Sequence, residues 1–295
     1  MKDLKIQEMM EMLECTINSI TSEEEYARYL KAMAKFPSYS VRNTLLIVSQ
    51  CPHASLVAGF STWKKDFKRY VKKGEKAIRI FAPYTYVQQT VSNDGTITET
   101  VRQSFRPVNV FDISQTDGKP MPEPSVPMLL EGNLSQFESI IEGLQACTDY
   151  EICFVPLQEA NGLCRHSTRQ ILIEESLGQM QTSKTLCHET AHSLLHDPGL
   201  ADNQTEQKIV SSNELKEIEA ESTAYIVCTW LNMDCSGFSF PYIAGWKRTG
   251  SFLEESLQRI SRTSYQIIET LKCFLELETE NHLPDAGDQV LRLSA

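Results

Sequence analysis

The chain has 295 residues, of which 41% are hydrophobic and 23% charged, and its formal net charge is −11. These values are ordinary for a globular protein with room for two domains. No apolar run approaches the roughly 18 residues of a membrane helix, and residues 1–14 are charged and amphipathic, without the apolar stretch of a secretory signal. We expect a cytoplasmic protein with no membrane partner.

The first predicted elements are helices. Apolar residues recur at helical spacing over residues 4–20. A second helix over 21–36 starts with Thr21 or Ser22 as its N-cap, followed by acidic residues, and a proline ends it. A third helix is predicted over 40–50.

The next segment departs from the overall acidity. Residues 61–80 contain eight Lys or Arg against Asp66 and Glu75, a local balance of +6 that leaves −17 for the rest of the chain. The average charge argues against non-specific nucleic-acid binding by the whole chain. The asymmetry makes this basic segment, residues 61–80, the candidate for contact with an anionic partner.

Two long strand patterns follow at 76–91 and 95–113. Both are rich in β-branched and aromatic residues, and the Asn-Asp-Gly sequence at 93–95 is typical of a turn between antiparallel strands. These patterns predict a long antiparallel pair within an N-terminal α+β domain.

The segment 112–127 is rich in Pro, Gly and polar residues, so we place a domain boundary there and expect domains of residues 1–125 and 126–295. The second domain has predicted helices over 134–147, 213–231 and 251–278, strands over 151–155 and 169–174, and a further helix around residue 190. Both domains are therefore predicted to be α+β, the second with a small sheet beside its central helix.

That central helix carries the string His188-Glu189-x-x-His192, and Thr182 or Ser183 is expected to cap it. Side chains at i and i+4 share one helix face, so both imidazoles can reach one tetrahedral Zn²⁺ at about 2.0–2.1 Å. The intervening carboxylate can take a proton from metal-bound water. A chance match occurs in roughly one chain of this length in a hundred. We predict zinc ligation by both histidines and a catalytic base at Glu189.

A catalytic zinc site needs a third protein ligand and an open position. His196 lies about 12 Å beyond His188 along the helix axis, so it is expected to cap or pack instead. Glu217 and Glu221 share a helix face, where one can ligate the metal while the other accepts a hydrogen bond from a ligand histidine. A solvated acidic face is the alternative, but apolar neighbours indicate a packed helix. Glu219 should point elsewhere.

His-Glu-x-x-His followed about 25 residues later by Glu-x-x-Ala-Glu resembles the gluzincin class of zinc metallopeptidases. More closely, it resembles the ImmA/IrrE-like and ArdC-like zincins of bacteria and their mobile elements. The N-terminal half is similar to the ArdC-type N-terminal domain in its Y-S-x-x-N, V-A-G-F-x-x-W and V-K-K-G-E-K sequences.

The resemblance implies Glu217 as the third zinc ligand and Glu221 as the partner of a ligand histidine. It implies that the strand over 169–174 is the sheet edge beside the cleft, where an extended peptide could add. It further implies single-stranded DNA binding by the N-terminal domain and an antirestriction role in a plasmid or conjugative element.

The basic segment offers independent support for a DNA partner. A single-strand binder needs cations along the phosphates and aromatic rings on which bases stack. The predicted nucleic-acid-binding residues are Tyr39, Arg42, Asn43, Trp63, Lys64, Lys65, Lys68, Arg69, Lys72, Lys73 and Lys76, with Phe60 and Tyr70 as further stacking candidates. The alternative is that these lysines form a solvated helix face and these rings belong to the core.

Three functions follow from these patterns. The leading one is a zinc metallopeptidase-like protein with a peptide or protein substrate and a domain that binds single-stranded DNA. The second is a non-catalytic antirestriction factor that shields DNA and holds a structural zinc, for which Glu189 would be unnecessary. The third is a regulatory peptidase that cleaves one specific repressor, with the basic segment bound to DNA or to an acidic protein.

Overall fold

The computed structural model describes residues 2–91, 97–121, 134–200, 213–238, 240 and 250–275. These residues fall into two compact units, one of residues 2–16 and 42–121 and the other of residues 17–41 and 134–275. Both units mix helices with small sheets, so the predicted α+β class is confirmed. None of the helices in these ranges is long and apolar enough to cross a membrane.

The first unit is organised around a long hairpin. Its elements are α1 (Lys2–Ser19), α3 (Val41–Gln50), β1 (Val57–Gly59), α4 (Phe60–Lys65), β2 (Arg69–Val71), β3 (Ile78–Val91), β4 (Ile97–Asp112), η1 (Ile113–Gln115) and β5 (Thr116–Gly118). Strands β1, β4 and β3 form one antiparallel sheet in that order, and β2 pairs with β5. The predicted third helix and long strand pair are confirmed, whereas the short strands were not predicted. The expected Asn-Asp-Gly turn lies outside the described residues.

The base of the hairpin is fixed to α3 by two side-chain amides. Asn43 accepts from the backbone N–H of Phe81 and donates to its carbonyl, each at 2.8 Å. Gln50 makes the same pair of bonds to the backbone of Arg79, at 2.9 Å each. These amides provide hydrogen-bond partners for backbone groups of Arg79 and Phe81 that face away from β4. Ile80, between these two residues, is buried in the core.

The second unit includes α2 (Glu23–Lys35), which Ser22 caps by accepting from the Glu25 N–H. The apolar face of α2 packs on α7, and the Tyr26 hydroxyl lies 2.8 Å from the Ser222 hydroxyl inside that contact. This burial explains why residues 17–41 belong to the second unit, although the sequence-based division placed them in the first domain. The predicted boundary between 125 and 126 lies outside the described residues.

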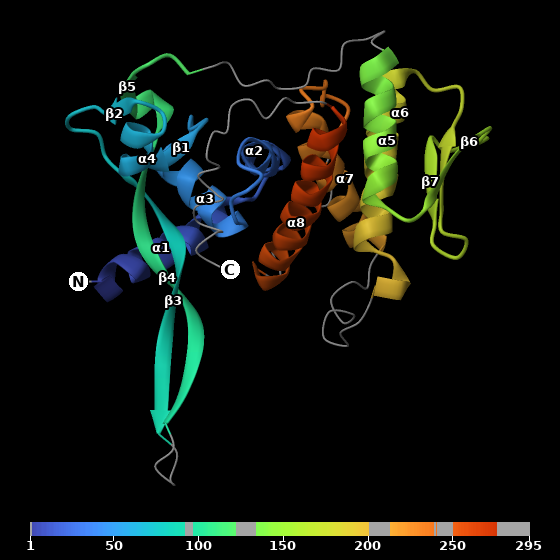
Figure 1. Cartoon of the computed structure of the whole chain (residues 1–295). Coiled ribbons are helices and arrows are strands. Elements are labelled where there is room, and N and C mark those ends of the chain that lie inside the picture. The colour runs from blue at the N-terminus through green and yellow to red at the C-terminus, as the bar shows by residue number, and fades with distance from the viewer. Residues whose placement is uncertain are drawn as a thin grey trace. The chain divides into compact units, whose positions relative to one another are not determined.

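The remaining elements of the second unit are α5 (Leu134–Cys147), β6 (Glu151–Val155), β7 (Gly162–Arg165), β8 (Gln170–Glu174), α6 (Gln179–Leu195), η2 (Pro198–Leu200), α7 (Asn213–Trp230) and α8 (Gly250–Phe274). Helix α6 packs against α7, β7 and β8, and α8 packs against α5 and α7 (Figure 1). All the helices and strands predicted for this half are present, and β7 was missed.

Two local predictions were wrong. The sheet order is β6-β8-β7, with β6 parallel and β7 antiparallel to β8. The strand over 169–174 is therefore central, with β6 and β7 at the two edges of the sheet, and β7 is the edge strand that packs against α6. Helix α6 begins earlier than expected, with Gly178 as its N-cap, so Thr182 and Ser183 are buried within it. Their hydroxyls bond backbone carbonyls of the preceding turn instead of capping the helix.

Candidate metal centre

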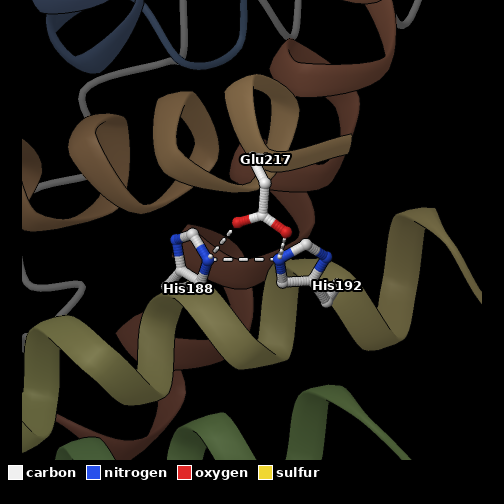
Figure 2. Close-up of side chains that lie close together, drawn as sticks. All are labelled: His188, His192 and Glu217. Atoms are coloured by element: carbon white, nitrogen blue, oxygen red, sulfur yellow. Dashed lines mark hydrogen bonds and ion pairs between the residues drawn. The ribbon is translucent and has the colours of Figure 1, made fainter. Parts of the chain in front are cut away.

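The three predicted metal ligands come together at the contact of α6 and α7. His188 and His192 stand one turn apart on α6, and Glu217 faces both from α7 (Figure 2). Nε2 of His188 lies 3.1 Å from Nε2 of His192. The carboxylate of Glu217 lies 3.4 Å from each of these nitrogens, through Oε2 to His188 and Oε1 to His192.

These separations suit a single small cation. Bonds of about 2.0–2.1 Å in a tetrahedral site place neighbouring ligand atoms about 3.3 Å apart, close to the three distances measured between these side chains. Two imidazole nitrogens and one carboxylate form a donor set with room for a fourth, open position. The residues present therefore fit a zinc ion.

The surrounding charge also favours a cation. Nδ1 of His188 lies 2.9 Å from Oε2 of Glu221, as expected for a hydrogen bond that leaves Nε2 facing the centre. Burial lowers the pKa of His188, but the bonds to Glu217 and Glu221 outweigh it and raise the pKa to about 10. Conversely, hydrogen bonds from His188 and His192 hold the pKa of Glu217 well below its usual range. The carboxylates thus stabilise positive charge at the position a metal would take.

His192 is supported differently from His188. Its Nδ1 lies 3.0 Å from Nδ1 of His196, whose Nε2 lies 3.2 Å from Oε2 of Glu219. The other carboxylate oxygen of Glu219 is bonded to the guanidinium of Arg259 on α8. Burial raises the pKa of Glu219, but the bonds to His196, Ser256 and Arg259 prevail and lower it. His196 is the C-cap residue of α6, so it caps and packs as predicted.

Glu189 lies under the edge strand β7. It is buried, and burial raises the pKa of its carboxyl group despite a hydrogen bond from the Cys164 backbone. A Cβ atom added to Gly162 would lie 2.9 Å from Cγ of Glu189 and 2.5 Å from Cγ2 of Thr185. The missing side chain of Gly162 therefore lets β7 approach α6 closely enough to hold Glu189 in place.

A pocket of about 280 Å³ opens beside this carboxylate. It is lined by Asn161, Gly162, Gln181, Lys184, Thr185, His188, Glu189, Glu221, Gly237 and Phe238. The pocket is therefore bordered by the candidate ligand His188, the candidate base Glu189 and strand β7. Lys184, whose Nζ lies 5.8 Å from the ring centre of Phe238, adds a positive charge to the pocket wall.

The predicted nucleic-acid-binding residues divide into two groups. Tyr39 and Trp63 are buried; the Trp63 indole N–H donates to the Phe111 carbonyl at 2.9 Å. Asn43 is buried on the backbone of β3. All three side chains are part of the core, and their contact with nucleic acid stays a prediction. The cations Arg42, Lys64, Lys65, Lys68, Lys72, Lys73 and Lys76 are exposed, while Arg69 is half-buried and bonded to Thr116 and the Lys119 carbonyl.

Comparison with known families matches the N-terminal and C-terminal parts of the chain to two different domains. Residues 5–111 match the N-terminal domain of anti-restriction factor ArdC, and residues 146–229 match the IrrE N-terminal-like domain. The second match spans both α6 and α7, and with them all three candidate ligands. The chain therefore contains two regions, one similar to each of these domains.

A relative of this chain is the uncharacterized protein pXO2-81 of Bacillus anthracis, 31% identical over 93% of the chain. The chain spans 53% of that relative's length. Among solved structures, the metal-free antirestriction ArdC protein from the R388 plasmid has a TM-score of 0.54 at 16% identity, over 80% of this chain and 84% of that one. The Mn(II)-bound structure of that protein has a TM-score of 0.49 at 15% identity, over 81% and 85% of the two chains.

Sequence reasoning missed several residues around the centre. The contact between Glu219 and Arg259 was not predicted, because it depends on how α7 packs against α8. A glutamate between apolar residues on a packed helix is nevertheless expected to be buried with a charged partner. Gly162 and the Cys164 backbone were missed because β7 was not predicted. No pattern in the sequence identifies the contact between β7 and Glu189.

Proposed function

We propose that this chain is a zinc metallopeptidase-like protein whose first unit binds single-stranded DNA, with an antirestriction role in a plasmid or conjugative element. The observation that carries the peptidase part is the trio of distances among His188, His192 and Glu217, combined with the buried Glu189 beside an open pocket. A structural zinc site is normally closed by four protein ligands, and it does not require an additional carboxylate such as Glu189.

In this proposal, His188, His192 and Glu217 would hold the zinc ion, which when bound would supply a water of lowered pKa and a Lewis acid for the scissile carbonyl. Glu189 would act as the general base that accepts a proton from the attacking water and as the general acid that delivers it to the leaving amine. Its raised pKa, caused by burial, makes it a stronger base than an exposed carboxylate. The Cys164 backbone N–H orients the carboxylate, and Glu221 holds His188.

The edge strand offers a way to bind a substrate. Strand β7 pairs with β8 along one side, and it borders the pocket through Gly162. An extended peptide could pair with the other side of β7, since main-chain bonds to a sheet edge provide affinity without demanding a sequence. The substrate class we propose is therefore an extended segment of a protein.

The metal site is tested by measuring zinc per chain, by elemental analysis, in the wild type, His192→Ala and Glu217→Gln. We expect about one zinc in the wild type and a large loss in both variants, each with an unchanged circular dichroism spectrum. His53→Ala removes an exposed histidine of the first unit and should keep the metal. A folded wild type that binds no zinc even after reconstitution would refute the metal site.

Catalysis is tested separately with Glu189→Gln, which should keep zinc and lose cleavage of DNA-associated proteins. If this variant also keeps biological protection against restriction, the non-catalytic antirestriction factor is the correct function. A requirement for one repressor as the substrate would instead favour the regulatory peptidase.

For the DNA-binding part, the exposed half of the β3–β4 hairpin supplies the stacking surface that the buried aromatic residues do not. Direct cross-strand partners share one face of an antiparallel pair, so Tyr84, opposite Ser104, and Tyr86, opposite Arg102, lie on the same face. Arg106 belongs to that face too, and its guanidinium lies 6.0 Å from the ring centre of Tyr84. Figure 1 shows the hairpin extending well beyond the short strand β1.

This Tyr–Arg face, defined as Tyr84, Tyr86, Arg102 and Arg106, has the chemistry a single strand requires. The two rings lie 6.0 Å apart and offer surfaces on which bases stack, while the two arginines, both exposed, face the phosphates. The opposite face is apolar at its exposed Val87–Val101 pair. We therefore assign nucleic-acid contact to the Tyr–Arg face together with the exposed lysines of the basic segment.

Fluorescence anisotropy with a labelled oligo-dT strand tests this assignment. Replacing both Tyr84 and Tyr86 by Ala should weaken binding by about 2–6 kcal/mol, at about 1–3 kcal/mol for each lost stacking partner. The matched control, Val87→Ser with Val101→Ser, changes the other face at the same level of the hairpin and should bind normally. Equal binding by all three proteins would exclude the Tyr–Arg face, and no binding by the wild type would exclude the DNA function itself.

A further inference from the structure

The two candidate histidine ligands differ in what holds their outer ring nitrogens. Nδ1 of His188 faces a carboxylate, whereas Nδ1 of His192 lies 3.0 Å from Nδ1 of another histidine, His196. Two imidazole nitrogens bond to each other only when one carries a hydrogen and the other a lone pair. The direction of this one hydrogen bond therefore determines which nitrogen of His192 is left to bind a cation.

Glu219 sets that direction. The side chains of His196 and Glu219 are both fully buried, with Nε2 of His196 lying 3.2 Å from Oε2 of Glu219. The other oxygen of Glu219 pairs with the Arg259 guanidinium, so the carboxylate is ionised and can only accept. The hydrogen of a neutral His196 therefore sits on Nε2, and its Nδ1 has only a lone pair.

His192 must then donate through Nδ1–H to His196. Its Nε2 keeps the lone pair, and this is the nitrogen that lies 3.4 Å from Glu217 and 3.1 Å from His188. We propose that Arg259, Glu219 and His196 form a positioning relay that fixes the tautomer and ring orientation of His192 for metal binding. This inference rests on the proposed metal site.

Stability alone does not require such a relay. Buried ion pairs can often be replaced by apolar side chains of similar volume at little cost in stability, and the surrounding helices are already packed by residues such as Ala220, Ile260 and Leu257, all buried. The relay also gives α8 a role at the centre, since Arg259 reaches Glu219 from that helix and donates to its neighbour Ser256 at 3.3 Å.

The test compares zinc affinity across the wild-type chain and four variants, by competition with a chromophoric chelator. His196→Phe removes the acceptor, and Glu219→Gln removes the charge that fixes its tautomer; each should weaken zinc binding about 10- to 100-fold. His196→Asn should recover much of the loss, because an amide oxygen can accept from His192 Nδ1–H.

Thr223→Val is the matched control. Thr223 is equally buried and lies one turn from Glu219 on α7, but its hydroxyl bonds only the backbone carbonyl of Glu219, at 2.8 Å. This variant should change stability and keep wild-type zinc affinity. A relay that served only for packing would give the opposite pattern, with stability changed in His196→Phe and zinc affinity unchanged.

Long-range ¹H–¹⁵N correlation spectra of the histidine rings provide a readout that does not depend on affinity. The wild type should carry the hydrogen of His192 on Nδ1, and a hydrogen on Nε2 in the metal-free protein would overturn the proposal. Folded His196→Phe and Glu219→Gln proteins with wild-type zinc affinity would overturn it too, while leaving the metal site intact. No zinc binding by the wild type would refute both the site and the relay.

Discussion

The α6–α7 centre and the β3–β4 hairpin place their polar groups in opposite ways. At the centre, the ligand nitrogens converge from packed helices, and each histidine is oriented by a second hydrogen bond, from His188 to Glu221 and from His192 to His196. On the hairpin, tyrosines and arginines are spread along an exposed ribbon. A rigid, preorganised cluster suits a small cation, whereas a spaced, exposed row suits a flexible polymer.

The basic segment combines both kinds of environment, because its lysines are exposed but its tryptophan is buried. Helix α4 presents Lys64 and Lys65 to solvent while Trp63, between Phe67 and the Phe111 carbonyl, fills the core. Aromatic residues next to lysines therefore do not all belong to the binding surface. Four variants test these differences between packed and exposed regions.

The largest effect is expected at Trp63. Trp63→Ala should lower the free energy of unfolding of the first unit by about 3–5 kcal/mol, because a fully buried ring and its hydrogen bond are lost. Urea denaturation measures this change. Phe60→Ala on the same helix removes a ring that is 56% exposed and should cost far less. A stable Trp63→Ala protein that no longer binds oligo-dT would show that Trp63 stacks on bases.

The next largest effect is expected at Asp112, the last residue of β4. Its carboxylate accepts from the backbone N–H groups of Ser55, Leu56 and Ser114 at 2.8, 3.1 and 3.0 Å. Asp112→Ala should cost about 1.5–3 kcal/mol at neutral pH, the value of a hydrogen bond to a charged group. Burial raises the pKa of Asp112, but these bonds prevail and lower it.

A lowered folded-state pKa fixes the sign of the pH dependence. The stabilisation is fully present above the unfolded-state pKa of about 3.9 and is lost as the pH falls through the folded-state value. The stability difference between wild type and Asp112→Ala should therefore shrink below about pH 4. A difference that stays constant down to pH 2 would contradict the role of the charged carboxylate.

A smaller effect is expected where β7 crosses α6. Gly162→Ala should cost about 1–3 kcal/mol, because its Cβ would lie only 2.5 Å from Thr185 Cγ2. Zinc content should be retained, while the displaced Glu189 should reduce any cleavage activity. Gly178→Ala is the control, since no atom lies within 4 Å of its added Cβ. Thermal unfolding measures the stability of the two variants. A loss of stability in Gly162→Ala alone would show that the close contact between β7 and α6 is the cause, whereas equal losses would point to an effect common to replacing any glycine.

The smallest effect on stability is expected for the double variant Lys64→Gln, Lys65→Gln, within about 0.5 kcal/mol as for most surface changes. If both lysines face phosphates, the slope of log affinity for oligo-dT against log salt concentration should fall by about 1.4. An unchanged slope would confine DNA contact to other cations, such as Arg102 and Arg106.

The residues brought together by short-range geometry were largely predictable. His188 and His192 meet because positions four apart on a helix share a face, and Glu217 and Glu221 share a face for the same reason. The long helices and the hairpin strands have strong periodic patterns and were also predicted. The short strands β1, β2, β5 and β7 have three or four residues each, too few for any pattern to establish.

Local residue patterns were enough to predict the helix carrying the histidines, the acidic helix that faces it, the long hairpin and the charge of the basic segment. The packing of segments distant in the chain established that Trp63 and Asn43 are buried, that β7 and not β8 lies at a sheet edge, and that Glu219 and Arg259 reach His192 through His196. The physical reason is that periodicity reports which residues share a face of one element. Which faces are then covered, and which buried charges find partners, depends on elements far apart in the chain.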